Sequence, residues 1–153
     1  MPVRGPLSHI DLTIRDPERS IPFYAAFFEA LGWHRFPSGE PDFQGPSPRR
    51  AAWFTRYGTG SFFGIEARPA SEESRDQKID RYAPGLHHMA FHAESPQDVD
   101  RIHQALAASG ATVLDPPADY GDQPGYGPRY YASFYADPDG LKLEVVYEPL
   151  SNP

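Results

Sequence analysis

Two segments of the chain alternate apolar and polar residues with a period of two, which is typical of a half-buried strand. In residues 7–14, isoleucine and leucine side chains share one face and His9 lies on the other. In residues 86–93, apolar side chains again share one face and His88 lies on the other. Each segment is therefore predicted to be a strand that opens a structural module.

A helical pattern follows each of these strands. After the first strand, apolar residues recur at helical spacing until Gly32, which is a plausible C-terminal stop. Pro22 fits the first turn of this helix if Ser20 is its N-cap. After the second strand, Ser95 and the proline that follows it predict a helix that ends at Gly110.

Each predicted helix is followed by several predicted strands, so each half of the chain has the order strand, helix, strands. An Asp-Pro-Asp-Gly turn at 137–140 introduces the last strand. This order predicts an α+β fold. The later strands are predicted at 33–36, 51–57 and 61–68 in the first half, and at 112–114, 129–135 and 141–147 in the second.

The two halves repeat each other. His9 and His88 lie 79 positions apart, and Glu66 and Glu144 lie 78 positions apart. Each half therefore opens with a histidine and closes with a glutamate, and both residues have apolar neighbours. We expect one domain made of two modules and a charged linker, with bounds of about 5–68, 69–84 and 85–148.

The same period of two predicts where these four side chains point. The apolar faces of the strands should pack against the helices, which leaves His9, Glu66, His88 and Glu144 on the uncovered faces. Each residue alone would be interpreted as a structural histidine or a solvated carboxylate. Because the pair recurs in both halves, we interpret the four as ligands of one divalent metal ion: Zn, Ni, Fe, Mn or Co.

Other residues are candidates for contact with a substrate. Thr13 and His92 share the predicted ligand faces. Phe54, Phe62 and Tyr131 are candidates for the walls of a site, although each is equally well explained as core.

Two Pro/Gly-rich stretches, 37–48 and 115–128, lie at matching places in the two halves. Each is either a long turn or a lid over a site. The second stretch carries Tyr120 and Tyr126, which we therefore include among the candidate substrate residues.

Composition narrows the class of protein. The 153 residues carry a formal net charge of −7, which argues against a nucleic-acid partner. No run approaches the roughly 18–20 apolar residues of a membrane helix, and the first residues contain no apolar signal region. The absence of cysteine fits a reducing compartment. We therefore expect a cytoplasmic protein that needs no organic cofactor.

Four segments of the chain resemble the vicinal oxygen chelate superfamily, which includes glyoxalase I, extradiol dioxygenases and bleomycin-binding proteins. The resemblance covers about residues 5–148 and is most specific in the closing Asp-Pro-Asp-Gly-x-x-x-Glu. The segments are Leu-Ser-His-Ile-Asp-Leu-Thr-Ile at 7–14, Phe-Tyr-Ala-Ala-Phe-Phe-Glu-Ala-Leu-Gly at 23–32, Gly-Leu-His-His-Met-Ala-Phe at 85–91, and Asp-Pro-Asp-Gly-Leu-Lys-Leu-Glu-Val at 137–145.

The resemblance implies paired βαβββ modules that form a cupped, barrel-like mixed sheet around a metal, often in a homodimer. The family's metal positions fall on His9, Glu66, His88 and Glu144. It also implies a lyase or isomerase that acts on a small oxygen-bearing substrate by proton transfer through a metal-bound enediolate. Glu144 is the first candidate for the base and Glu66 is the second.

Two alternatives remain open. A non-haem Fe(II) dioxygenase needs only His9, His88 and Glu144, with Glu66 outside the ligand set. A protein that binds an aromatic compound or an antibiotic without catalysis needs no metal. Glutathione conjugates are not expected as substrates, because Thr13 and Ala70 replace the Arg and Asn that glyoxalase I usually carries at these places.

Overall fold

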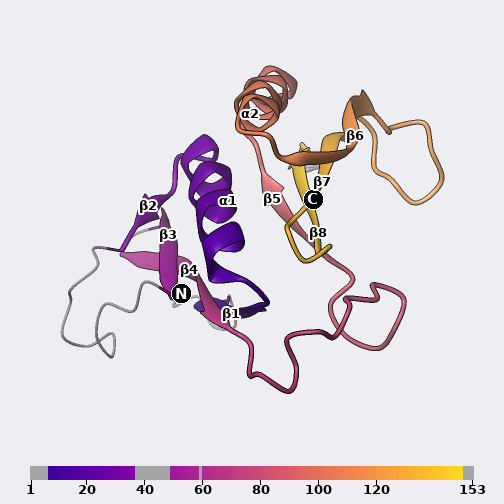
Figure 1. Ribbon diagram of the computed structural model, residues 1–153. Helices are drawn as coiled ribbons and strands as arrows, with labels where there is room; N and C mark the ends of the chain where they lie inside the picture. The colour runs from indigo at the N-terminus through magenta and orange to yellow at the C-terminus, as the bar shows by residue number, and fades with distance from the viewer. Residues whose placement is uncertain (1–6, 37–48, 59, 150–153) are drawn as a thin grey trace. The chain divides into compact units, whose positions relative to one another are not determined.

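The computed structural model describes residues 7–36, 49–58 and 60–149, and it divides the chain into two compact units, Met1–Gln77 and Lys78–Pro153 (Figure 1). The division falls within the predicted linker 69–84. Unit 1 contains β1 (His9–Ile14), α1 (Pro17–Ala30), β2 (His34–Arg35), β3 (Ala51–Tyr57) and β4 (Ser61–Pro69). Unit 2 contains β5 (His88–His92), α2 (Pro96–Ala108), β6 (Thr112–Asp119), β7 (Tyr131–Ala136) and β8 (Lys142–Tyr147).

The described residues of each unit form a four-stranded mixed sheet with the same strand order, β1-β4-β3-β2 in unit 1 and β5-β8-β7-β6 in unit 2. In both sheets the first strand of the module pairs with the last strand in parallel, and the remaining pairs are antiparallel. The α+β class and the repeated modules are thus confirmed. Each sheet is open. Its edge strands are β1 and β2 in unit 1, and β5 and β6 in unit 2.

In unit 1, α1 covers one face of the sheet because its apolar stripe is aromatic. Tyr24 and Phe28 are fully buried, and their rings lie 6.1 and 5.2 Å from that of Trp53 on β3. Ile65 of β4 is also buried. The predicted alternation therefore holds, and the opposite face of this sheet, which carries His9 and Glu66, is not covered by the helix.

In unit 2, α2 contacts β6, β7 and β8 through a smaller aliphatic stripe. Val99, Ile102 and Leu106 are buried, as are Leu143 and Val145 of β8. This packing fixes β8 between β5 and β7. It also directs the residues that alternate with Leu143 and Val145 to the face away from the helix.

The predicted N-cap of the first helix is wrong. The helix begins at Pro17, and the Asp16 carboxylate accepts a hydrogen bond from the Glu18 backbone N–H at 3.0 Å. Pro22 thus lies inside the helix rather than in its first turn, and Ser20 is buried within it. The predicted cap of α2 is confirmed, because Ser95 Oγ accepts from the Asp98 N–H at 3.1 Å.

The two predicted Pro/Gly-rich stretches have different outcomes. Strand β6 extends to Asp119, so it takes in the first residues of the predicted lid 115–128, with register shifts against β7 on either side of Asp115. The stretch 37–48 lies outside the described residues. Among the described residues, neither helix is long and apolar enough to cross a membrane.

Candidate functional site

His88 and Glu144 face each other across the β5–β8 pair of unit 2. The parallel register sets Ala90 opposite Glu144, so His88 lies on the same face two residues earlier. The distance from His88 Nε2 to Glu144 Oε2 is 3.2 Å. The carboxylate side chain is only 2% exposed, whereas the imidazole side chain is 37% exposed. The pair therefore combines a buried carboxylate with a partly exposed imidazole ring.

The Asp137–Gly140 turn sets the start of β8. Asp137 is buried, and its Oδ1 accepts from the backbone N–H groups of Asp139 and Leu141 at 2.9 and 2.7 Å. Gly140 closes the turn at a φ of 93°, a conformation that favours glycine. This turn fixes the strand three residues before Glu144.

Tyr130 was not among the predicted site residues, but its hydroxyl donates a hydrogen bond to Glu144 Oε1. Burial and this hydrogen bond raise the pKa of Tyr130 well above its usual value, so the hydroxyl remains a donor. The two oxygens of Glu144 thus have different partners, Tyr130 on one and His88 on the other. Tyr130 falls in the predicted strand 129–135, and in the structure it lies one residue before β7.

Aromatic rings surround this carboxylate on the face away from α2. The Tyr130 ring lies 4.8 Å from that of Tyr126, and Tyr120 lies 5.4 Å from Tyr126 and 5.6 Å from Phe134. Tyr120 and Tyr130 pack against a small buried cluster that includes Phe134. Tyr126, predicted as a substrate residue, therefore contacts the tyrosine that binds Glu144, and Tyr120, also predicted, contacts Tyr126 in turn.

The ring of His87 contacts that of His88. The two Nδ1 atoms are 2.7 Å apart, which requires one ring to donate and the other to accept. With Nδ1 engaged, His88 has Nε2 left for Glu144 or for a metal ion. His87 therefore has a part in orienting the ring of His88.

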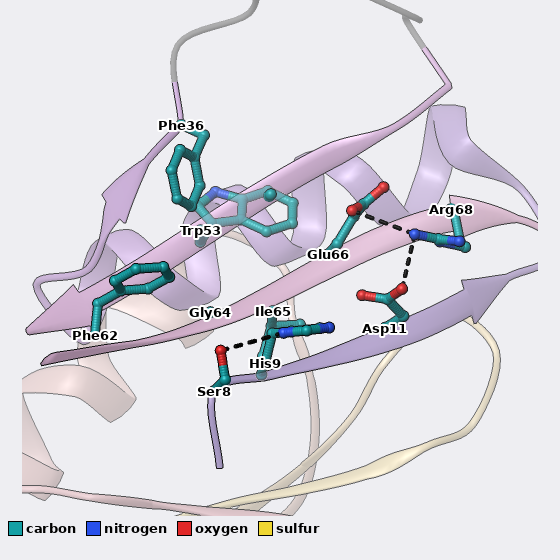
Figure 2. Close-up of a pocket in the computed structure, with 11 residues that line it drawn as sticks. Ser8, His9, Asp11, Phe36, Trp53, Phe62, Gly64, Ile65, Glu66 and Arg68 are labelled. Atoms are coloured by element: carbon teal, nitrogen blue, oxygen red, sulfur yellow. Dashed lines mark hydrogen bonds and ion pairs between the residues drawn. The ribbon is translucent and has the colours of Figure 1, made fainter. Parts of the chain in front are cut away.

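In unit 1, His9 and Glu66 line one cavity of about 380 Å³ on the face of the sheet away from α1 (Figure 2). Parallel pairing of β1 with β4 sets His9 opposite Gly64 and Asp11 opposite Glu66. Ser8 Oγ lies 3.3 Å from His9 Nδ1. The predicted common face of His9 and Glu66 is therefore observed within unit 1.

Two arginines occupy the Glu66 carboxylate. Arg50 donates from Nε at 2.8 Å, and also from Nη2, to Glu66 Oε1. Arg68 Nη2 lies 3.4 Å from Glu66 Oε2 and 2.7 Å from Asp11 Oδ2. Sequence reasoning missed Arg50, which lies sixteen residues from Glu66 and just before β3. A metal ion would have to displace these guanidinium contacts to bind Glu66. The contacts described here for His9 and His88 involve no arginine.

The four predicted ligands thus fall into two pairs, one on the open sheet face of each unit. In the described parts of the chain, no group of three or more His, Asp or Glu side chains is arranged to hold a metal ion. The donor chemistry of His88 with Glu144 fits a divalent ion. The contacts of Glu66 do not favour a cation, and its place among the ligands stays a prediction.

The remaining candidates lie as follows. Thr13 is on the face of β1 that carries His9, and His92 is on the face of β5 that carries His88. Phe62 lines the unit 1 cavity. Tyr131, a candidate wall residue, is on the wrong face, because its hydroxyl donates to Asp100 of α2 at 2.9 Å.

Comparison with known proteins agrees with these features. The family model of the Glyoxalase/Bleomycin resistance protein/Dioxygenase superfamily matches residues 7–145. The protein YqjT of Bacillus subtilis, which has no characterised function, is 30% identical over 142 residues, covering 92% of this chain and 97% of YqjT. Two solved structures are also similar, a proposed glyoxalase from Bacillus halodurans and a glyoxalase/dioxygenase from Nostoc punctiforme.

The Bacillus halodurans structure has a TM-score of 0.69 and 27% identity, and the match covers 94% of this chain and 96% of that one. The Nostoc punctiforme structure has a TM-score of 0.66 and 20% identity, with 97% and 98% covered, and shows the fold alone. Two repeated modules, each a helix packed on a four-stranded mixed sheet, define a glyoxalase-type fold. The chain belongs to the Glyoxalase/Bleomycin resistance protein/Dioxygenase superfamily, whose members generally bind a divalent metal and a small molecule.

Proposed function

We propose that the chain is an enzyme that uses one divalent metal ion to transform a small oxygen-bearing substrate. The observation that carries this proposal is the His88–Glu144 pair, with its 3.2 Å separation and its buried carboxylate. His9 is the third proposed ligand. A metal bound by these residues would supply Lewis acid chemistry to substrate oxygens.

The residues of the chain have separable tasks in this proposal. His88 and Glu144 hold the cation, and Tyr130 keeps one oxygen of Glu144 engaged. Glu66 lies in the same cavity as His9, where a substrate would reach it. A carboxylate in that place suits proton transfer to and from substrate carbon, which is the chemistry of a lyase or an isomerase. For this role Glu66 must exchange at least one arginine partner when substrate binds.

A second candidate is favoured by the arginine contacts of Glu66. If Arg50 and Arg68 stay on that carboxylate, the proposed ligands are His9, His88 and Glu144. Two histidines and one carboxylate are the ligand set of non-haem Fe(II) oxygenases. In this case Glu66 is a charged wall residue and oxygen is a co-substrate.

Metal content tests the proposal. We expect the purified protein to hold close to one divalent ion per chain by elemental analysis, and H88A and E144Q to lose most of it. H103A is the matched control, since His103 is hydrogen-bonded to Tyr135 on the helix side of the sheet. Full metal content in both H88A and E144Q would refute the ligand assignment.

The E66Q variant separates the two reaction types. If E66Q loses its metal, or if it loses a substrate turnover that consumes no oxygen in the parent, the lyase or isomerase is supported. Unchanged metal content with oxygen uptake after anaerobic Fe(II) loading and addition of a catechol supports the dioxygenase.

A further inference from the structure

The cavity of unit 1 has two chemically different ends. Phe36 and Phe62 line one end, and Asp11, Glu66 and Arg68 line the other, with His9 and Gly64 between them (Figure 2). A ligand that fills this cavity would meet aromatic rings at one end and charged groups at the other.

The aromatic end is built for a flat apolar group. Phe36, Phe54 and Phe62 form a corner in which Phe36 lies 4.5 Å from Phe54 and 6.3 Å from Phe62 between ring centroids. Phe62 is nevertheless 48% exposed, which is high for so large an apolar side chain. A ring bound in this corner would cover apolar surface and make edge contacts with the three phenyl groups.

At the charged end, the guanidinium of Arg68 has a hydrogen-bond donor that is not in use. Arg68 makes both of its ion pairs through Nη2. Its Nε is buried and has no hydrogen-bond partner among the described residues. A guanidinium that uses one of its nitrogens can turn two N–H groups toward a carboxylate. If Arg68 turned toward such a ligand, Asp11 and Glu66 would lose its contacts. Glu66 would still bind Arg50, and Asp11, which is 36% exposed, would be solvated by water.

Gly64 keeps the middle of the cavity open. A Cβ at this position would lie 3.4 Å from the Trp53 carbonyl oxygen and 4.0 Å from the His9 Cβ, which are ordinary contacts. Alanine is therefore tolerated by the backbone. A longer side chain would extend from the open face of β4 into the space between Phe62 and Glu66.

From these features we propose that the unit 1 cavity binds a small aromatic carboxylate, with its ring in the phenylalanine corner and its carboxylate on Arg68. The substrate class rests on the proposed function only in that this cavity is taken as the substrate site. The binding itself requires no metal, so it is tested on the metal-free full-length chain.

Phenylacetate is the probe. Acetate, which lacks the ring, and phenethylamine, which keeps the ring but carries a positive charge, are the comparison compounds. We expect saturable binding of phenylacetate in ligand-observed NMR titrations, and at least tenfold weaker binding of the other two. R68Q and F62A should each weaken phenylacetate binding by about tenfold, while R75Q, in an exposed segment, should not change it.

The size of residue 64 provides a graded test. G64A should bind phenylacetate more weakly than the parent, and G64L should not bind it, with thermal unfolding used to show that each variant folds. Equal binding of phenethylamine and phenylacetate, or full phenylacetate affinity in R68Q or G64A, would overturn the proposed class. Metal content is measured separately. Phenylacetate binding in a chain that never binds metal would leave this inference standing and defeat the proposed function.

Discussion

Burying a carboxylate is costly unless hydrogen bonds replace its water. Glu144 is almost fully buried, and the Tyr130 hydroxyl and the His88 ring supply those contacts. The side chain is therefore held in one orientation before any ligand arrives. Such preorganisation lowers the cost of ordering the side chain when a cation binds.

We predict that Y130F weakens metal binding by about tenfold, because a hydrogen bond from outside the ligand set orients the carboxylate. The dissociation constant is measured by competition with a chelator. The control is Y126F, which alters the ring 4.8 Å from that of Tyr130 and leaves the hydrogen bond from Tyr130 to Glu144 in place. Equal affinity in Y130F and the parent would show that Tyr130 does not orient the ligand.

Tyr135 predicts an alkaline loss of stability. Burial raises the pKa of this phenol, so the folded chain keeps a proton that the unfolded chain releases near pH 10. The free energy of unfolding should therefore fall as the pH rises above about 10. Urea unfolding between pH 8 and 11 should show a smaller fall in Y135F. Y82F, at an exposed position, should keep the parental slope.

The sheet face on which a residue lies was predictable where the residue belongs to a strand of alternating apolar and polar positions. His9, Glu66, His88 and Glu144 lie on the open faces that the period of two assigns to them. Arg50 and Tyr130 escaped prediction as site residues. Arg50 lies just before β3, where side-chain direction has no period to follow, and Tyr130 fell within the predicted strand 129–135 with no repeat in the other half to single it out. Their contacts with Glu66 and Glu144 depend on strand register, which local sequence does not encode.

At the scale of elements, the two helices show how capping residues compete. Asp16 and Ser20 both suit an N-cap, and Pro22 favoured the second. The helix instead begins earlier, with Pro17 at its first position, and the added turn buries Pro17 and Ser20 ahead of the Tyr24 and Phe28 contacts with Trp53. Tertiary packing thus outweighs the unfavourable proline within the helix.

The cap assignment gives matched variants. D16A should lower the free energy of unfolding by about 1 kcal/mol, because it removes the acceptor for an end N–H group. S20A should be neutral or stabilising, because the buried Ser20 hydroxyl has no hydrogen-bond partner within the described residues. Urea denaturation at pH 7 measures both changes. A larger loss in S20A than in D16A would contradict the observed cap.

At the scale of the whole molecule, the proposal is one metal per chain with ligands from both units. Metal should then stabilise the two units together, by an amount that grows with the logarithm of free metal concentration. Differential scanning calorimetry should show one transition that moves upward with added metal. Two transitions, of which only one responds, would mean that a single unit holds the ion.

The strand order has a consequence for how the chain is made. In each unit the histidine strand is the first to be synthesised and the glutamate strand is the last, yet the two are neighbours in the sheet. A ribosome that stalls before residue 142 releases a product without Glu144 and without the strand that β5 and β7 both need. Incomplete chains therefore lose a central strand of the unit 2 sheet and the proposed cation-binding pair in the same event.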